Sequence, residues 1–302
     1  MSKERIGFIG VGFMGHGMAK NLVEKGHALT ILGHRNRAPV DDLVKRGAKE
    51  AKTAEEVAKQ SDIVFLCVTG SPEVEANVRG PNGLKAGARK GLIIVDTSTS
   101  DPNSTLALAK ELATLGVAFC DAPLGGTPAQ AEEGKLSTMV GCDEAVWPRL
   151  EPVLTCFAPK SVRIGPVGDG HKMKLMMNFF AMGYGAIYSE ALALGAKVGL
   201  SPQTIDSVIR GSRMDCGFYQ TFFSYVLERN RDAHKFTLKN ASKDMTYLAA
   251  MAKAAGLKNP MGAAIRDYYG SAVAAGRGED YVPMLSDFVA AQNGISATRR
   301  DS

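Results

Sequence analysis

The chain has 302 residues, of which 45% are hydrophobic and 22% charged, as is ordinary for a globular protein with room for two domains. The net charge is +5 and the basic residues are interleaved with acidic ones, so composition gives no case for nucleic-acid binding. The five cysteines are scattered without a C-x-x-C pair, so neither a metal site nor a disulfide framework is expected. With no signal-peptide pattern at the N-terminus and no membrane-length apolar run, we expect a cytoplasmic protein with no membrane partner.

The first predicted element is a short apolar strand at 6–9, which leads into glycines spaced G-x-G-x-x-G. Gly10 would allow the turn out of the strand, Gly12 would admit a pyrophosphate close to the backbone, and Gly15 would let a helix pack on the strand. That helix, expected over about 14–25, offers N–H groups and a positive dipole end to phosphates. A glycine-rich turn without a ligand is the alternative, but the position between strand and helix patterns favours dinucleotide binding.

The second predicted strand, 28–32, is followed by Gly33-His34-Arg35-Asn36-Arg37. Dinucleotide folds that prefer NAD usually place Asp or Glu here, on the ribose hydroxyls. This segment has two arginines, a histidine and no carboxylate, which favours a 2′-phosphate and therefore NADP over NAD. His34, Arg35 and Arg37 are the expected contacts, and an exposed basic loop is the alternative.

Strands and helices continue to alternate up to about residue 165. The capping box Thr53-Ala54-Glu55-Glu56 and the pair Asp101-Pro102 each predict the start of a helix. The further strands are expected at 62–68, 92–96, 117–121, 137–141 and 161–164. The alternation predicts an α/β fold whose N-terminal domain, residues 1–165, is a doubly wound Rossmann domain.

The pattern changes at the glycine-rich junction 165–170, after which every segment reads as helix. Residues 171–198 contain no proline and are apolar on nearly every face, which predicts a long interdomain helix buried between packed elements. It leads into an all-α C-terminal domain, residues 166–302, for substrate binding and oligomerisation. Surplus apolar surface around 176–182 predicts self-association, at least as a dimer. Further helices are expected from 202, and at 240–255, 260–275 and 281–292.

Two polar groups stand out in this half. Lys174 and Asn178 are four residues apart on the long helix and share a face. A lysine on an apolar helix is unfavourable unless it has a partner or a function, and burial lowers a lysine pKa toward useful proton transfer. The residues alone leave open that Lys174 reaches solvent and Asn178 caps a neighbour. On the same grounds Lys243-Asp244 reads as a surface pair.

Four motifs in order make residues 5–293 resemble the β-hydroxyacid dehydrogenase family. The motifs are Gly10-Val11-Gly12-Phe13-Met14-Gly15 with 18–22, Asp121-Ala122-Pro123 with 134–136, Gly168-Asp169-Gly170 with Lys174 and Asn178, and Lys243-Asp244. The resemblance implies an oxidoreductase that uses NADP or NAD and acts on a small hydroxy acid or semialdehyde. It also implies association through the helical domain as a homodimer or homotetramer.

The resemblance implies site residues one by one. Lys174 resembles the catalytic general acid/base, and Asn178 the neighbour that holds the substrate. The implied cofactor contacts are the glycine loop with Phe13 and Met14, the carboxyl edge of the sheet at Leu66, Thr69 and Ser98, and Lys243 beside the nicotinamide.

The loop after Asp121 departs from the family pattern Asp-Ala-Pro-Val-Ser-Gly-Gly, since the serine position is Gly125. Gly125 and Gly126 can present backbone N–H groups to a carboxylate, and Thr127 a hydroxyl, so these three are the expected acid-binding residues. The loop is closer to Gly-Arg-Thr-Ser of the sulfolactaldehyde reductase subgroup, but the sulfonate-binding arginine of that subgroup is Gly126 here. The favoured substrate is therefore a 3-hydroxyisobutyrate-like 3- or 4-hydroxy acid or its semialdehyde.

Three alternatives remain at this stage. They are a sulfolactaldehyde-type reductase, a non-catalytic cofactor-binding interaction module, and an imine reductase. Lys174 discriminates against the last two, because relatives without dehydrogenase activity lack this lysine and imine reductases carry a different residue there.

Overall fold

The computed structural model describes residues 3–33 and 35–295 and divides the chain into two compact units, Met1–Lys174 and Leu175–Ser302. The division falls inside the long helix α9 (Asp169–Lys197), one turn beyond the glycine-rich junction at which the sequence predicts it. Each unit has its own hydrophobic core.

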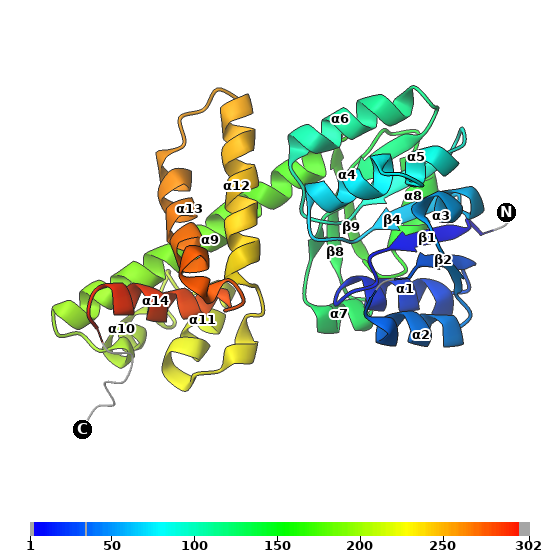
Figure 1. The fold of residues 1–302 in the computed structure, drawn as a ribbon. Coiled ribbons are helices and arrows are strands. Elements are labelled where there is room, and N and C mark those ends of the chain that lie inside the picture. The colour runs from blue at the N-terminus through cyan, green and yellow to red at the C-terminus, as the bar shows by residue number, and fades with distance from the viewer. Residues whose placement is uncertain (1–2, 34, 296–302) are drawn as a thin grey trace. The chain divides into compact units, whose positions relative to one another are not determined.

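The first unit is built on a nine-stranded sheet with the order β3-β2-β1-β4-β5-β6-β8-β7, in which β9 pairs with β8 (Figure 1). The first six strands of this order are parallel, as in a doubly wound dinucleotide fold, whereas β8 is antiparallel to β6 and β7. The strands are β1 (Ile6–Ile9), β2 (Leu29–Leu32), β3 (Lys49–Ala51), β4 (Ile63–Leu66), β5 (Ile93–Asp96), β6 (Ala118–Asp121), β7 (Leu124–Gly125), β8 (Ser137–Gly141) and β9 (Lys160–Gly165).

Side chains alternate between the two faces of this sheet. Phe8 and Phe65 belong to one hydrophobic cluster, and Ile9, Val64 and Leu66 to the other, so neighbouring residues of β1 and β4 serve opposite faces. Helices cover both faces, which is why these strands read as continuous apolar runs in the sequence. The helices of this unit are α1 (Gly15–Glu24), α2 (Arg37–Lys45), α3 (Ala54–Gln60), α4 (Ser71–Arg79), α5 (Leu84–Gly87), α6 (Pro102–Ala113), α7 (Pro128–Glu132) and α8 (Trp147–Leu154).

Local capping chemistry sets where these helices begin. The Thr53 hydroxyl accepts from the N–H of Glu56 at the start of α3, and the Asp101 carboxylate accepts from the N–H of Asn103 at the start of α6. Both helix starts predicted from the sequence are therefore confirmed. Gly26 ends α1 with a φ of +80°, the left-handed conformation expected just beyond a helix C-terminus.

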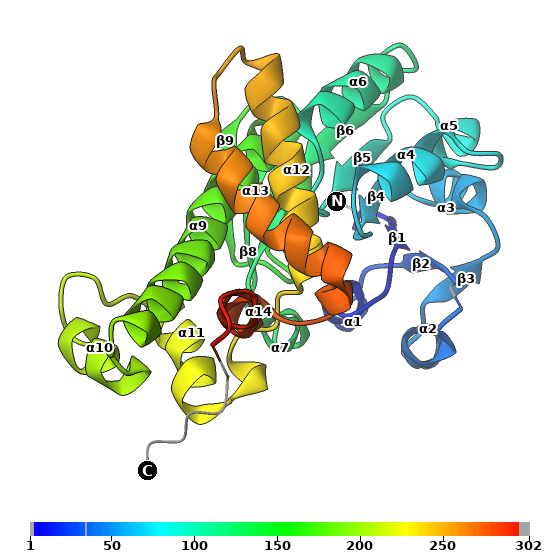
Figure 2. The same ribbon diagram turned by 60° about the vertical axis from the view of Figure 1, so that its left-hand side comes forward.

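The second unit is helical, and Figure 2 shows α12 and α13 lying side by side. Tyr219, Phe222, Phe223 and Tyr269 form its aromatic core together with Met182 of α9. Besides α9, the α-helices are α10 (Pro202–Ile209), α11 (Gly217–Glu228), α12 (Leu238–Ala254), α13 (Pro260–Ala272) and α14 (Leu285–Gln292). Among the described residues beyond 165, the only β pairing is a single bridge between Thr237 and Tyr281.

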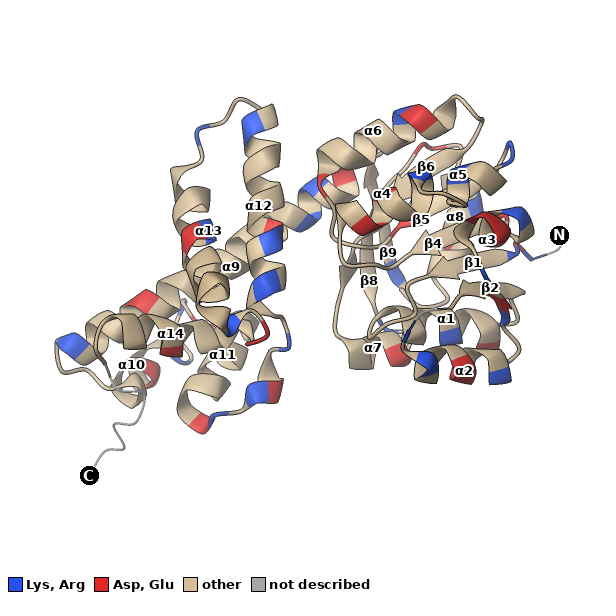
Figure 3. Cartoon of the chain, viewed as in Figure 1, with Lys and Arg blue, Asp and Glu red and all other residues tan. Residues whose placement is uncertain are grey.

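The sequence predicts that α9 is buried between packed elements, but the structure leaves one of its faces exposed. Met182 and Ala186 lie in the core of the second unit, whereas Tyr184, Ile187 and Leu194 are exposed. Figure 3 shows charged residues dispersed over both units, and the sequence has none between Lys174 and Glu190. The helix therefore has one covered and one uncovered apolar face.

Within the described ranges, no helix is both long and apolar enough to cross a membrane. The same residues contain no group of three His, Cys, Asp or Glu side chains that could hold a metal ion.

Candidate functional site

The three glycines after β1 are required for different reasons. Gly10 has a φ of +98°, and a Cβ there would lie 2.1 Å from the carbonyl oxygen of Cys67. A Cβ at Gly15 would lie 2.0 Å from the carbonyl oxygen of Gly10. A Cβ at Gly12, in contrast, would meet nothing within 4 Å. Gly12 therefore has no steric reason within the chain to be glycine, and a ligand that approaches the backbone supplies one.

The start of α1 has the character of an anion site. Met14 precedes the helix without a side-chain cap, and the first turn contains no acidic residue. The positive dipole end of the helix therefore faces the glycine loop without a side-chain cap from α1 itself. Phe13, at 91% exposure, projects from the same loop, and Met14 is half-buried. These features fit the pyrophosphate of a dinucleotide.

At the end of β2 the structure adds a carboxylate that the sequence analysis missed. Glu50 of β3 forms two hydrogen bonds with the Arg37 guanidinium, at 2.7 and 2.9 Å, and Arg37 also bonds Asp41 at 3.0 Å. The hydrogen bond from Arg37 holds the pKa of Glu50 below its usual value despite the opposing desolvation. A Cβ at Gly33 would lie 2.0 Å from Glu50 Oε1, so this glycine admits the carboxylate.

Arg35 lies beside this ion pair. The two arginines, Glu50 and Gly33 line a pocket of about 700 Å³. Within the described part of the chain, Arg35 has no carboxylate partner, so its guanidinium is available to an anion. Arg37 is already engaged, which weakens its expected role as a phosphate contact. His34 lies outside the described residues.

The predicted contacts along the carboxyl edge of the sheet differ in accessibility. Thr69 is exposed after β4. Leu66 is fully buried, and its carbonyl oxygen accepts from the Thr97 N–H and hydroxyl, so it has no side-chain surface to offer a ligand. Ser98 is buried, and its hydroxyl accepts from the N–H of Val68 at 3.0 Å. Ser98 therefore stabilises the edge as well as lying on it.

The expected acid-binding residues form a turn with a defined backbone conformation. Gly125 lies in β7, opposite Ser137 of β8, and Gly126 has a φ of +128° that L-residues rarely adopt. Thr127 caps α7, since its hydroxyl accepts from the Gln130 N–H while its own N–H donates to Gln130 Oε1. The Thr127 main-chain N–H is thus already used, whereas its hydroxyl hydrogen can still be donated.

Lys174 forms a hydrogen bond at the start of this turn. Its Nζ donates to the carbonyl oxygen of Leu124 at 2.9 Å, and the side chain is half-buried. Gly125 and Gly126 follow directly in the sequence. The first unit therefore brings together two parts of the predicted site that lie fifty positions apart in the chain.

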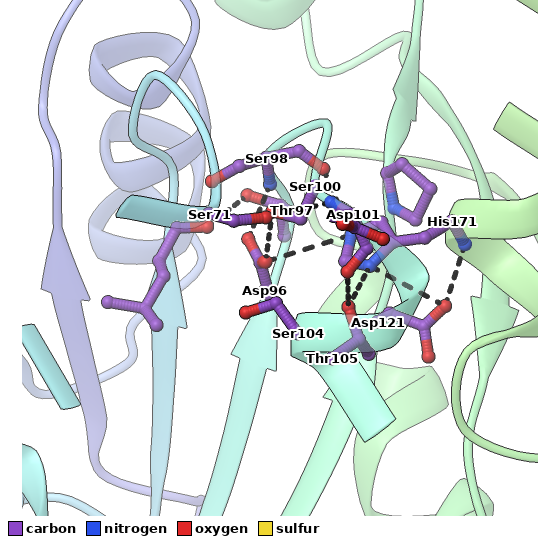
Figure 4. Close-up of polar contacts among 12 residues, drawn as sticks. Ser71, Asp96, Thr97, Ser98, Ser100, Asp101, Ser104, Thr105, Asp121 and His171 are labelled. Carbon is purple, nitrogen blue, oxygen red and sulfur yellow. Dashed lines mark hydrogen bonds and ion pairs between the residues drawn. The ribbon is translucent and has the colours of Figure 1, made fainter. Parts of the chain in front are cut away.

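Asp121 and His171 form a buried polar cluster that the sequence analysis did not assign (Figure 4). Asp121 accepts from the N–H of Gly168 at 2.6 Å and of His171 at 2.7 Å, and so caps the start of α9. Burial raises the Asp121 pKa, and the charge of His171 and these hydrogen bonds oppose the rise. An aspartate at the end of a buried strand and a histidine in a glycine-rich junction were the available signals.

In the second unit Asp244 is buried at 1% exposure, so the surface pair expected from local chemistry is wrong. Asn178 Nδ2 donates to Asp244 Oδ2 at 2.6 Å. Because an ionised carboxylate only accepts, this contact fixes which side of the Asn178 amide faces Asp244. Lys243 Nζ lies 2.9 Å from Asp244 Oδ1 and 5.0 Å from the centre of the Tyr247 ring.

Comparison with known proteins gives consistent matches along the chain. Residues 5–165 match the family described as the NAD binding domain of 6-phosphogluconate dehydrogenase. Residues 168–286 match the family described as the NAD-binding domain of NADP-dependent 3-hydroxyisobutyrate dehydrogenase.

Individual relatives agree. The chain is 37% identical to 2-(hydroxymethyl)glutarate dehydrogenase of Eubacterium barkeri over 208 residues, 68% of each chain. It is 33% identical to 2-hydroxy-3-oxopropionate reductase of Escherichia coli over 276 residues, covering 90% of this chain and 92% of the relative. A solved 3-hydroxyisobutyrate dehydrogenase from Mycobacterium tuberculosis has a TM-score of 0.85 at 24% identity, covers 95% of this chain and 99% of its own, and shares the fold.

Proposed function

Because the chain belongs to the β-hydroxyacid dehydrogenase family of NAD(P)-dependent oxidoreductases, we propose that it interconverts a small 3- or 4-hydroxy acid and the corresponding semialdehyde. The observation that carries this proposal is the hydrogen bond from Lys174 to the carbonyl oxygen of Leu124. It holds a proton-donating ammonium beside the turn at Gly125 and Gly126, where a substrate carboxylate has backbone N–H groups to bind.

The nicotinamide, when the cofactor is bound, carries the hydride, and the protein supplies position and protons. Lys174 Nζ gives a proton to the aldehyde oxygen in reduction and removes one from the alcohol in oxidation. Asn178, whose amide Asp244 orients, holds the substrate oxygen. Lys243 supports the nicotinamide end of the cofactor, and Gly12 with the start of α1 supports its pyrophosphate.

We further propose that NADP(H) is preferred over NAD(H). Arg35 faces a pocket at the end of β2 and has no carboxylate partner among residues 3–33 and 35–295. Glu50 is engaged by Arg37 through two hydrogen bonds, so it competes less for ribose hydroxyls than an unpaired carboxylate would. The guanidinium of Arg35 suits the geometry of a 2′-phosphate.

A sulfolactaldehyde-type reductase is less well supported. Gly126 adopts a φ of +128°, and a Cβ there would lie 2.8 Å from Leu136. This turn therefore has no place for the sulfonate-binding arginine without a change of backbone. A carboxylate needs no such side chain, because main-chain N–H groups can bind it.

We also propose that the protein is a homodimer or homotetramer that associates through the exposed face of α9. Phe180, Tyr184, Ile187, Leu194 and Val198 are all exposed and recur at helical spacing. A continuous apolar stripe of this kind is typical of a protein–protein contact, and a two-fold contact is the default for self-association.

The proposed activity is tested by supplying NADPH or NADH with a panel of aldehydes and following loss of the reduced cofactor. Methylmalonate, tartronate and succinate semialdehydes carry the carboxylate, sulfolactaldehyde carries a sulfonate, and propionaldehyde carries neither. We expect turnover of at least one carboxylate-bearing aldehyde, faster with NADPH, and little with propionaldehyde. Absence of turnover across the panel with both cofactors would contradict the proposal.

A further inference from the structure

The geometry points to His171 as a positioning residue for the proposed reaction, which fixes the first turn of the helix bearing Lys174 to Ser98 at the carboxyl edge of the sheet. This inference rests on the proposed function of Lys174. His171 is fully buried and stands one helical turn before Lys174 on α9. It cannot touch a ligand from solvent, so any effect on catalysis passes through the backbone that it holds.

The imidazole makes a directional contact with the sheet. His171 Nε2 lies 3.1 Å from the carbonyl oxygen of Ser98. A carbonyl only accepts, so Nε2 carries the hydrogen and donates it. The hydroxyl of Ser98 in turn accepts from the N–H of Val68 at 3.0 Å. The ends of β4 and β5, where cofactor contacts are expected, are thereby connected to the first turn of α9.

The other ring nitrogen has a less restrictive partner. His171 Nδ1 lies 2.7 Å from the Thr105 hydroxyl, which can either donate or accept. Two carboxylates face the ring at longer range, Asp96 Oδ2 at 3.7 Å from Nε2 and Asp121 Oδ2 at 4.0 Å from Nδ1. Figure 4 shows these groups converging on the ring from β5, β6 and α6.

Further hydrogen bonds, which do not involve the imidazole ring, also hold the first turn of α9. Asp121 accepts from the main-chain N–H groups of Gly168 and His171, and Lys174 donates to Leu124, which follows Asp121 by three positions. These contacts set Lys174 relative to the acid-binding turn. The ring contact with Ser98 is what sets it relative to the cofactor edge. Hydride and proton transfer need Lys174 to be correctly placed relative to both the acid-binding turn and the cofactor edge. A misplacement of about 1 Å can lower the rate on the order of 100-fold.

Two matched substitutions separate the contacts of the ring. In His171→Gln the side-chain amide nitrogen lies the same number of bonds from Cα as Nε2 and can still donate to Ser98. In His171→Asn the amide reaches only as far as Nδ1, so it can meet Thr105 but not Ser98. Both variants are neutral and polar, and both keep the main-chain bond to Asp121. Thr105→Val removes the Nδ1 partner and leaves the Ser98 contact in place.

We expect His171→Asn to lower kcat by about 10- to 100-fold, while KM and the NADPH Kd stay within about threefold of wild type. The isotope effect with 4-deuterated NADPH should rise, because hydride transfer becomes slower. His171→Gln and Thr105→Val should keep kcat within about threefold. Equal kcat values for the Gln and Asn variants, whether high or low, would overturn the inference, as would a loss in Thr105→Val that matches His171→Asn.

A readout independent of turnover separates this inference from the proposed function. Acylation of Lys174, followed by mass spectrometry of the intact protein and its peptides, should change several-fold in His171→Asn and little in His171→Gln. If the wild-type protein reduces no aldehyde, the proposed function is refuted. The labelling experiment still tests whether His171 positions Lys174. Unchanged labelling in His171→Asn would count against it. If that variant does not fold, His171→Met, which fills the space without a donor, takes its place with the same expectation.

Discussion

Lys174 Nζ donates a hydrogen bond to the carbonyl oxygen of Leu124 at 2.9 Å. A carbonyl oxygen accepts a hydrogen bond without taking up the proton, as the proposed role of Lys174 in proton transfer requires. The same segment continues into Gly125 and Gly126, and a carboxylate held there would bring a nearby carbonyl within reach of the ammonium. In the proposed reaction, the position of this one lysine would connect substrate binding with proton transfer.

Lys174→Ala should lower kcat by about 10²- to 10⁴-fold, the usual contribution of a positioned acid or base. The NADPH Kd should be nearly unchanged, because the glycine loop does not depend on this side chain. Lys172→Ala is the matched control, since Lys172 pairs with Asp169 at 2.9 Å one turn earlier. Near-normal turnover in Lys174→Ala would remove this residue from the mechanism.

The glycine loop gives a prediction that separates binding from folding. Gly12→Val should weaken binding of either cofactor by more than about tenfold, because the side chain would occupy space that the structure leaves open to a ligand. Its melting temperature should stay close to wild type. Gly10→Ala should instead lower stability by on the order of 1–3 kcal/mol, since its φ of +98° is unfavourable for alanine. Unchanged cofactor binding in Gly12→Val would place the pyrophosphate elsewhere.

Arg35→Glu should raise the Kd of NADPH more than that of NADH, because the new carboxylate would repel a 2′-phosphate and could bond ribose hydroxyls. Lys90→Glu, an equal change of charge on an exposed loop before β5, should leave the ratio unchanged. Fluorescence titration of both cofactors measures the two Kd values. A wild-type protein that binds NADH as tightly as NADPH would refute the preference.

Much of the fold follows from sequence because each buried parallel strand is a continuous apolar run between glycines or polar turns. The strands at 137–141 and 161–164 and the caps Thr53 and Asp101 are found where they are predicted. β3 and β7 were missed because they are only three and two residues long, and β3 includes two charged residues. Missing β3 also hid Glu50, which pairing in the sheet brings to the end of β2.

The site was predictable where chemistry is carried by local pattern, as in the glycine loop. Long-range contacts were not. Nothing in the sequence places Leu124 against Lys174, or the ring of His171 against Ser98. Asp244 reads as a surface residue because its neighbour is a lysine, yet helix packing buries it against Asn178. Such contacts depend on tertiary structure, so they cannot be predicted from the residues adjacent in the sequence.

The free energy of unfolding at acidic pH should depend on Asp62. This carboxylate accepts from the Arg5 side chain at 2.9 and 3.0 Å and from its N–H at 3.0 Å, and it also pairs with Arg89. The hydrogen bond from Arg5 holds the Asp62 pKa well below its usual value, with desolvation opposing the shift. The carboxylate is therefore more acidic in the folded state than in the unfolded state.

A lowered pKa in the folded state means that the stabilisation is present above the unfolded pKa of about 3.9 and is lost as the pH falls below it. Asp62→Asn should thus be less stable than wild type near neutral pH, and the difference should shrink as the pH falls below about 4. Asp267→Asn, at an exposed site 3.7 Å from Arg266, is the control. Urea unfolding across this range measures the effect, and parallel profiles for wild type and Asp62→Asn would contradict it.

The uncovered face of α9 leads to the last prediction, on association. Phe180, Tyr184, Ile187 and Leu194 line one side of the helix, Val198 follows its last residue, and all five are between 44% and 65% exposed. Several large apolar side chains in a row are unusual on the surface of a monomer, and burying them against a second copy would remove their exposed area from water. The purified protein at micromolar concentration should therefore scatter light as two or more chains of 32.1 kDa.

Ile187→Lys should shift this mass toward one chain, because a charge in the middle of an apolar contact is costly to desolvate. Leu257→Lys is the matched control, since Leu257 is 65% exposed but lies in the turn after α12, away from the stripe. It should leave the mass unchanged. A single-chain mass for wild type, with or without NADPH, would show that the stripe on α9 does not mediate self-association. An oligomer that both variants preserve would instead place the contact on another surface.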